Sequence, residues 1–375
     1  MKIAAISTSS VPSTSANSIQ VMKVCQALAQ SGHQVSLFVP QINSAGNDNP
    51  IDLNTHYGLR TTFPVIHLPN WWPLRRYDFC LAAVSRARRM GADVVYAWPL
   101  QAAFFALLYG LPVILEMHGP PEGRLGPLLF WAVHKMRGRR RLLVITQALA
   151  RMLQGKYNRL RIDEIAIAPN GVDIEQYTSL PSPQAARAAL GLPEVFTAAY
   201  TGHLYPGRGM PLLEELASRF PQVQFLCIGG KPEHVQAWRA HLEGLSCHNV
   251  RLFGFVPNQE LPRYQAAAEI LLMPYGRSIA GSSGGDSSAY ASPMKMFDYM
   301  ACRRAILSSD LPVIREILNE GNSLLCLPEE PSAWVAAFDR LLHDEGLRQR
   351  LANQAWQDVQ AYTWVKRAAR ALEGF

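Results

Sequence analysis

The chain lacks the motifs by which several classes of enzyme are recognised. No G-x-G-x-x-G follows its first apolar segment, which argues against a dinucleotide-dependent dehydrogenase. It contains no Walker A motif, no H-E-x-x-H, and no D-x-D that could hold a metal ion on a sugar diphosphate. The six cysteines form no C-x-x-C pair and lie in apolar contexts. We therefore expect reduced, buried thiols and a cytoplasmic protein.

Charged residues are scarce. They make up 17% of the 375 residues, whereas apolar residues make up 49%. This composition favours two globular domains over a disordered or fibrous protein. Residues 94–115 carry no charge and are long enough to cross a bilayer, but Pro99, Gly110 and Pro112 divide them into an expected strand, helix and strand. The apolar stretch after Lys2 is too short for a signal peptide.

The small excess of positive charge is confined to the first half of the chain. Residues 1–180 contain 18 basic and 10 acidic residues, a net charge of +8, whereas residues 181–375 contain 18 and 19, a net charge of −1. Aromatic and basic side chains mix in residues 71–77 and 130–141, which favours contact with the inner face of an anionic membrane. A solvated basic face is the alternative. No nucleic-acid recognition motif accompanies the charge.

Short β-branched runs alternate with amphipathic stretches, a pattern typical of parallel sheets covered by helices. The predicted fold class is α/β, with two Rossmann-like, doubly wound domains facing each other across a cleft. A Pro- and Ser-rich segment at 178–194 is expected to link them. The expected strands are residues 2–7, 34–39, 65–68, 93–97, 112–117, 142–146 and 164–168, then 197–201, 224–228, 250–253, 270–273 and 305–308. The expected helices include 18–30, 210–219, 232–242, 260–267 and 293–301.

A glycine-rich turn, T-G-H-L-Y-P-G-R-G-M at residues 201–210, follows one expected strand and precedes a helix. Glycines let backbone N–H groups approach an anion, and a helix N-terminus adds a positive dipole end. Arg208 supplies a forked donor for a phosphate oxygen, and His203 could add a second donor. An ordinary glycine-rich turn between strand and helix is the alternative interpretation.

A second segment, S-P-M-K-M-F-D-Y-M-A at residues 292–301, has the pattern of a helix start. Ser292 is a suitable N-cap and the following proline a suitable first helical residue. The N–H groups of Met294 and Lys295 would then be available to a phosphate. Asp298 lies one turn further along the same face, where it could accept hydrogen bonds from ribose hydroxyls. The preceding Ser/Gly-rich residues 278–292 are either a flexible loop or a lid that closes over a ligand.

A third segment, L-E-M-H-G-P at residues 115–120, ends a strand of the first domain. His118 would lie at the carboxyl end of that strand, where ligands of such sheets bind. Glu116 lies within the strand, where a structural carboxylate is the expected role.

The order of the short motifs along the chain resembles that of glycosyltransferase family 4. These motifs are, in order, H-G, P-N-G-V-D at 169–173, G-H-L-Y-P-G-R-G, F-G-F-V-P at 253–257, S-P-M-K-M-F-D-Y-M-A and Y-T-W at 362–364. The resemblance spans nearly the whole chain. It implies the GT-B fold and a retaining glycosyltransferase without a metal requirement or other cofactor. It further implies an acceptor-binding domain of residues 1–180, to which a final helix at 358–375 crosses back, and a donor-binding domain of residues 190–357.

The resemblance also implies the donor site. Arg208 matches the basic residue that binds the donor diphosphate, and its neighbour Gly207 belongs to the same loop. His203 stands where an arginine is common. The backbone near Val256 would contact the nucleobase, and Asn17 stands in a loop that is glycine-rich in the family.

Other matched positions concern the phosphates, the sugar and the ribose of the donor. Ser292, Met294 and Lys295 would bind the donor phosphates. Asp298 matches the second Glu of the E-x7-E motif, and Tyr290 stands where its first Glu, which contacts the donor sugar, is often found.

The implied reaction transfers a glycosyl group from a nucleotide-diphosphate sugar to a glycan or lipid-linked acceptor, in cell-surface polysaccharide or glycolipid synthesis. His118 and Arg208 are the expected catalytic residues. Two alternatives stay open: a catalytically inactive scaffold, because His203, Tyr290 and Asp298 depart from the family pattern, and a sugar-nucleotide epimerase, for which no convincing carboxylate pair is present.

Overall fold

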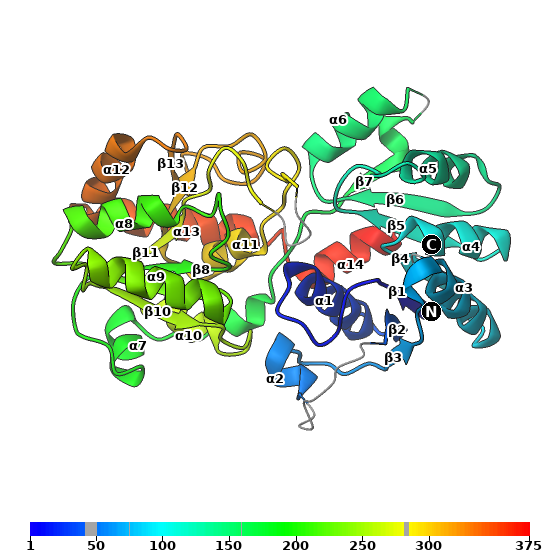
Figure 1. Ribbon diagram of the computed structural model, residues 1–375, viewed down its shortest axis with the longest axis horizontal. Coiled ribbons are helices and arrows are strands. Elements are labelled where there is room, and N and C mark those ends of the chain that lie inside the picture. The colour runs from blue at the N-terminus through cyan, green and yellow to red at the C-terminus, as the bar shows by residue number, and fades with distance from the viewer. Residues whose placement is uncertain (42–50, 75, 159, 281–284) are drawn as a thin grey trace. The chain divides into compact units, whose positions relative to one another are not determined.

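The computed structural model describes residues 1–41, 51–74, 76–158, 160–280 and 285–375 (Figure 1). The chain forms two compact units. Unit 1 comprises residues 1–170 and 364–375, and unit 2 comprises residues 171–363. Each unit is a parallel β-sheet covered by helices.

Unit 1 has a seven-stranded sheet in the order β3-β2-β1-β4-β5-β6-β7, in which every pairing is parallel. Central strands such as β4 and β5 are buried along their whole length, as expected where helices cover both faces. The strands are β1 Lys2–Ile6, β2 Gln34–Pro40, β3 Val65–Leu68, β4 Val94–Ala97, β5 Val113–Met117, β6 Arg140–Val144 and β7 Ile165–Ile167.

The helices of unit 1 divide between the two faces of its sheet. The helices α3, α4 and α5 lie side by side on one face, and α1 packs against α14 on the other (Figure 1). The last helix of the chain is therefore part of the first unit. The helices are α1 Ala16–Gln30, α2 Leu53–Tyr57, α3 Tyr77–Arg89, α4 Leu100–Leu108, α5 Gly126–Lys135, α6 Gln147–Lys156 and α14 Trp364–Leu372.

Unit 2 repeats the arrangement with six parallel strands in the order β10-β9-β8-β11-β12-β13. Its core includes Phe338, whose ring centroid lies 4.8 Å from that of Phe220 and 5.5 Å from that of Phe225. The strands are β8 Thr197–Thr201, β9 Gln224–Ile228, β10 Val250–Gly254, β11 Ile270–Met273, β12 Ala305–Ser309 and β13 Leu324–Cys326. The helices are α7 Pro183–Ala189, α8 Met210–Arg219, α9 Pro232–Gly244, α10 Leu261–Ala266, α11 Met294–Ala301, α12 Pro331–His343 and α13 Glu345–Val359.

Most expected strands form at the predicted places, and residues 94–115 form β4, α4 and β5 as predicted. In the described part of the chain no helix is both long and apolar enough to span a membrane. All six cysteines are free, and only Cys247 is not fully buried. The sequence pattern missed β13, a strand of three residues.

The predicted linker at 178–194 is wrong. The chain leaves unit 1 at Asn170, and residues 183–189 form α7 of unit 2. The Arg187 side chain is buried there and donates hydrogen bonds to Glu269 at 2.7 Å and Glu194 at 2.9 Å. The Glu269 ion pair and a hydrogen bond to the Ala267 carbonyl at 3.0 Å hold this Pro- and Ser-rich segment against the rest of unit 2. The returning segment is also shorter than predicted, because it starts at Trp364 and not at residue 358.

Candidate functional site

In unit 2 the glycine-rich turn lies at the topological switch point of the sheet. The strand order reverses between β1 and β4 in unit 1, and between β8 and β11 in unit 2. Ligands of doubly wound sheets bind beyond the carboxyl ends of the strands at this point. In unit 2, residues 202–209 follow β8 and Tyr275 follows β11.

The helix α11 is fixed over this point by Tyr299. The buried Tyr299 hydroxyl accepts hydrogen bonds from the Thr201 backbone N–H at 2.8 Å and side chain at 3.1 Å, and lies 3.3 Å from the Leu272 carbonyl oxygen. One side chain thus ties α11 to the ends of β8 and β11. The helix starts at Met294 with Pro293 as its N-cap, so the prediction of Ser292 as the N-cap is wrong by one residue. Met294 and Lys295 still begin the helix, where N–H groups have no intrahelical partner.

Two cations meet around buried tyrosine rings at this site. The Lys295 Nζ atom lies 3.9 Å from the centroid of the Tyr200 ring and 5.3 Å from that of Tyr275. The Arg208 guanidinium lies 5.2 Å from the Tyr275 centroid and donates hydrogen bonds to the Tyr275 hydroxyl at 3.2 Å and the Ala280 carbonyl at 2.9 Å. Both cations therefore approach the same ring.

The Lys295 ammonium is poorly compensated. Its Nζ atom is buried, although the residue as a whole is partly exposed, and it has no hydrogen-bond partner among the described residues. Burial, and then the charge of Arg208, hold the pKa of Lys295 well below its usual range. Gly202 permits this position, because a Cβ atom there would lie 2.6 Å from Nζ. An anion is the ligand that such a pair of cations attracts.

The glycine-rich turn is shaped by close packing. Gly209 has φ +82°, and a Cβ atom there would lie 1.8 Å from the Pro274 carbonyl oxygen, so only glycine fits. The Gly207 carbonyl accepts a hydrogen bond from the Gly276 N–H at 2.9 Å. The turn is thus held against the segment after β11, and α8 begins directly behind it at Met210.

Three further predicted donor residues, His203, Val256 and Tyr290, lie in the same unit. The His203 ring stacks on that of Tyr205, with centroids 4.7 Å apart. Val256 follows β10 and is partly exposed, and Tyr290 lies in a turn before α11. Residues 281–284 of the predicted lid lie outside the described residues. Around them, Ala280 pairs with Asp286, whose carboxylate accepts two backbone hydrogen bonds that lower its pKa to about 2.

Asp298 has a partner that the sequence did not suggest. Its carboxylate contacts the buried Tyr177 hydroxyl, and burial and then this negative charge raise the pKa of Tyr177. The Tyr177 hydroxyl also donates to Gln265 at 2.9 Å. The predicted contact of Asp298 with ribose stays a prediction.

In unit 1, the predicted residues lie beyond β1 and β5. Asn17 is exposed in the first turn of α1, which Ser15 caps. His118 directly follows β5, and its side chain is one-quarter exposed. Its Nε2 atom lies 2.6 Å from Glu116, which is fully buried and hydrogen-bonded, as predicted for a structural carboxylate.

Sequence reasoning missed the tyrosines that surround the two cations. Tyr200 is the fourth residue of β8, and its position in a strand indicates a core residue. Tyr275 follows the run I-L-L-M-P. A polar-tipped aromatic just after a buried strand is the one local signal that could have indicated Tyr275. Arg367, which reaches Glu116 from α14, gave no local signal.

These features define the class of the protein. Two parallel α/β units with reversing strand order form the GT-B fold of glycosyltransferases. The Anabaena protein HepE, solved in complex with UDP and glucose, superposes with a TM-score of 0.75 at 17% identity, covering 100% of both chains.

The sequence comparisons identify the family. The family model described as Glycosyltransferase Family 4 matches residues 18–176, and that of Glycosyl transferases group 1 matches residues 195–344. The chain belongs to glycosyltransferase family 4. It is 24% identical to phosphatidyl-myo-inositol mannosyltransferase of Mycolicibacterium smegmatis, over 94% of this chain and 87% of the relative. It is also 24% identical to D-inositol 3-phosphate glycosyltransferase of Xylanimonas cellulosilytica, over 95% and 90%.

Proposed function

We propose that the protein transfers a hexosyl group, with retention and without a metal ion, from a nucleoside-diphosphate sugar to a glycan or lipid-linked acceptor. The pair of Lys295 and Arg208 at the switch point of unit 2 carries the proposal. Two cations beside the first turn of α11 and the start of α8 suit a diphosphate, which carries negative charge on both phosphates.

The chemistry requires charge stabilisation on the leaving group. When the bond between the anomeric carbon and the diphosphate oxygen breaks, negative charge grows on that oxygen. Lys295, Arg208 and the α11 N–H groups are the donors that would stabilise it, in a site already organised before the reaction. The pair of side chains supplies positive charge of the kind that a divalent cation supplies in other transferases.

Membership of glycosyltransferase family 4 supports the proposed retention. The acceptor would attack on the face that the diphosphate leaves, and a donor phosphate oxygen would take up the acceptor proton. No side-chain nucleophile is then required. His118 would contact the sugar, and Asp298 would accept hydrogen bonds from the ribose.

Calorimetric titration with UDP, GDP, ADP, CMP and NAD tests the donor site. We expect one nucleoside diphosphate to bind, and Arg208→Ala to weaken that binding about tenfold or more, because a charge-assisted hydrogen bond contributes about 1.5–3 kcal/mol. The matched control is Arg219→Ala, since Arg219 is exposed and pairs with Glu215 on α8. Equal affinity in wild type and Arg208→Ala contradicts the proposed site. Absence of turnover with the matching nucleotide sugar and any acceptor favours the inactive scaffold.

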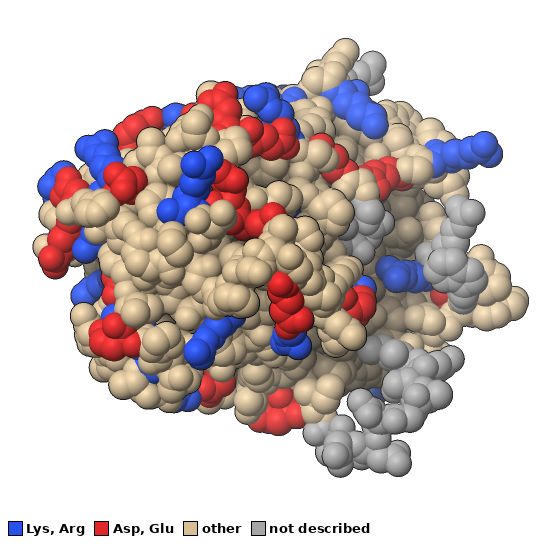
Figure 2. Space-filling model, turned by 60° about the vertical axis from the view of Figure 1, so that its left-hand side comes forward, with Lys and Arg blue, Asp and Glu red and all other residues tan. Residues whose placement is uncertain are grey.

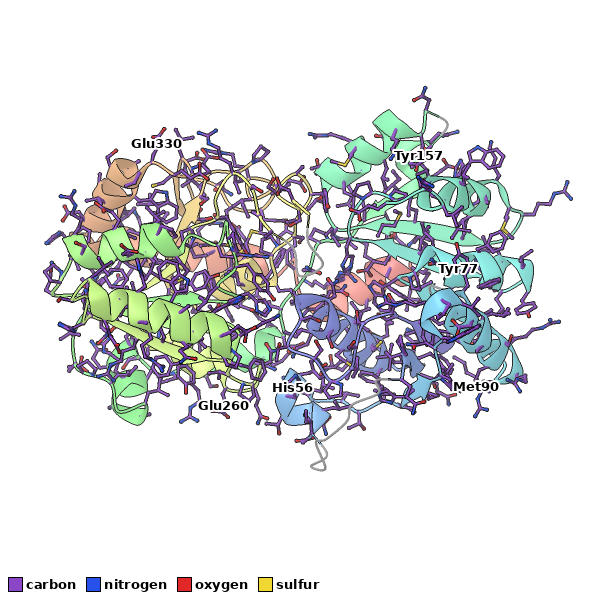
Figure 3. The ribbon with its side chains drawn as sticks, viewed as in Figure 1. His56, Tyr77, Met90, Tyr157, Glu260 and Glu330 are labelled. Carbon is purple, nitrogen blue, oxygen red and sulfur yellow. The ribbon has the colours of Figure 1, made fainter. Side chains whose placement is uncertain are left out.

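The acceptor side of the proposal includes an anionic membrane surface. The outer side of α5 carries Leu128 and Trp131, which are 65% and 56% exposed, with Lys135 at the end of the helix. Its inner side is anchored by Phe130, whose ring centroid lies 4.6 Å from that of Tyr157, labelled in Figure 3. Exposed apolar side chains next to basic ones are typical of a surface that lies on anionic lipid.

The basic residues of the predicted segment 130–141 contribute less to this surface than their number in the sequence indicates. Arg139 donates a hydrogen bond to the Gly374 carbonyl, and Arg141 donates one to the Arg370 carbonyl. Both guanidinium groups also lie over the Phe375 ring, so they interact within unit 1. Arg75, in the other predicted segment, lies outside the described residues. Figure 2, in which the side of unit 2 comes forward, shows basic and acidic side chains interspersed there, without a single-sign patch on that face.

Co-sedimentation with vesicles tests this surface. We expect binding to vesicles with anionic lipid and a several-fold loss in Trp131→Ser, while Leu245→Ser serves as control because Leu245 is 52% exposed in unit 2. Equal sedimentation of the two variants contradicts the proposal.

A further inference from the structure

A buried carboxylate in unit 1 collects hydrogen bonds from four elements. Glu116 of β5 is 1% exposed. Its Oε1 atom lies 2.6 Å from Nε2 of His118, 2.6 Å from Nε2 of Gln20 on α1, and 2.7 Å from Nη2 of Arg367 on α14. Its Oε2 atom accepts a hydrogen bond from the Tyr96 hydroxyl on β4. Residues far apart in the chain thus converge on the group behind His118.

The charge of Glu116 fixes the proton on the imidazole. Burial alone raises the pKa of Glu116, but the charge of Arg367 and the hydrogen bond from His118 outweigh burial and lower it below its usual range. An ionised carboxylate only accepts hydrogen bonds, so the hydrogen between His118 and Glu116 belongs to Nε2. Nδ1 is then the ring atom left to a ligand.

Arg367 balances the charge of Glu116. It is 4% exposed, donates from Nε to the Pro169 carbonyl at 2.9 Å, and lies 3.4 Å from the Tyr96 hydroxyl. Its pKa is raised, because Glu116 and Tyr96 outweigh the effect of burial. Without this cation, the buried charge of Glu116 would lack its permanently charged partner. Arg367 lies three residues after the chain re-enters unit 1, and Pro169 directly precedes Asn170, where it leaves.

We infer that Glu116 and Arg367 are positioning residues that hold His118 as a neutral imidazole, with hydrogen on Nε2 and the Nδ1 lone pair directed to the ligand. An Nδ1 lone pair binds a hydrogen-bond donor, and a sugar hydroxyl is the donor that a glycosyl substrate offers. A neutral ring also adds no positive charge beside an anomeric carbon that itself becomes positive. The ligand part of this inference rests on the proposed function.

Nitrogen-15 NMR of histidine-labelled protein tests the inference without a substrate. The His118 signals are identified by their loss in His118→Ala. We expect the neutral form with hydrogen on Nε2 in the wild type near neutral pH, the doubly protonated form in Arg367→Met, and the neutral form again in Arg367→Lys, which keeps a cation. Arg370→Met is the matched control, because Arg370 is exposed on the same helix.

Kinetics add a second readout. In Arg367→Met and Glu116→Gln we expect kcat to fall about 10- to 100-fold while the donor KM changes little, because the ring is misplaced or misprotonated in the transition state. The other titratable groups facing Glu116 are Tyr96 and Cys25, and burial raises the pKa of both, so they stay protonated near neutral pH.

Three results are distinguishable. A wild-type His118 that carries hydrogen on Nδ1, or on both nitrogens, overturns the inference even where the variants do not fold. Variants that lose stability but keep the wild-type His118 spectrum and kcat show a merely structural role and also overturn it. A wild-type spectrum as expected, together with no transfer from any nucleotide sugar, refutes the proposed function while the assignment of the ring stands.

Discussion

Replacement of Lys295 by methionine should change the free protein and its diphosphate complex in opposite directions. In the free protein, Nζ is buried without a hydrogen-bond partner among the described residues, and Arg208 adds a like charge. An unsatisfied buried polar group costs about 1–3 kcal/mol. The cation–π contact with Tyr200, at 3.9 Å, offsets about 1 kcal/mol of that. Methionine keeps the length of the side chain and packs well on aromatic rings. We therefore expect Lys295→Met to stabilise the free protein by about 1 kcal/mol.

The same substitution should weaken binding of the nucleoside diphosphate. Loss of a charge-assisted hydrogen bond costs about 1.5–3 kcal/mol, so the Kd for the nucleoside diphosphate should rise about 10- to 150-fold. Urea unfolding of the free protein and calorimetric titration of the diphosphate measure the two effects. Lys156→Met is the control, because Lys156 is exposed at the end of α6.

The pH dependence gives a further check on the same substitution. The pKa of Lys295 is lowered in the fold from its ordinary value of 10.5, so its charge destabilises the free protein below the lowered pKa. That cost disappears as the pH rises to 10.5. The stability advantage of Lys295→Met should therefore shrink as the pH rises. Lower stability of the free variant, or an unchanged Kd, would refute the reasoning.

Three further predictions concern packing and charge. Gly209→Ala should destabilise unit 2 by more than about 1 kcal/mol, because its Cβ atom would meet the Pro274 carbonyl at 1.8 Å, and thermal unfolding measures this. Tyr299→Phe should cost about 1–3 kcal/mol and weaken diphosphate binding, because the buried Thr201 N–H loses its partner; calorimetry and urea unfolding check it. Wild-type stability should fall as the pH drops below 4.5, the ordinary pKa of Glu116, because that group is stabilising only when ionised; the urea midpoint of Glu116→Gln should depend less on pH.

The sequence alone predicted the elements around the proposed donor site well. The strand at 197–201 and the helix at 210–219 form as predicted, because a short uncharged run that ends at a glycine and a three- to four-residue apolar period are local properties. The motif at 292–301 begins a helix within one residue of the predicted position, because proline strongly restricts where a helix starts. The predicted boundary at 178–194 was wrong for a tertiary reason, because the ion pair of Arg187 with Glu269 binds the segment to the rest of unit 2.

What the sequence by itself determined is the class of fold, the order of the strands along the chain and the family. Tertiary structure decided which side chains share a site. The direction of the Lys295 ammonium toward Tyr200 follows from Tyr299, which fixes α11 over two strand ends. Glu116 and Arg367 are 251 residues apart, and they meet only because α14 packs on α1 in the first unit. Local patterns record which residues form a helix or strand, whereas a contact between distant residues depends on how the completed elements pack.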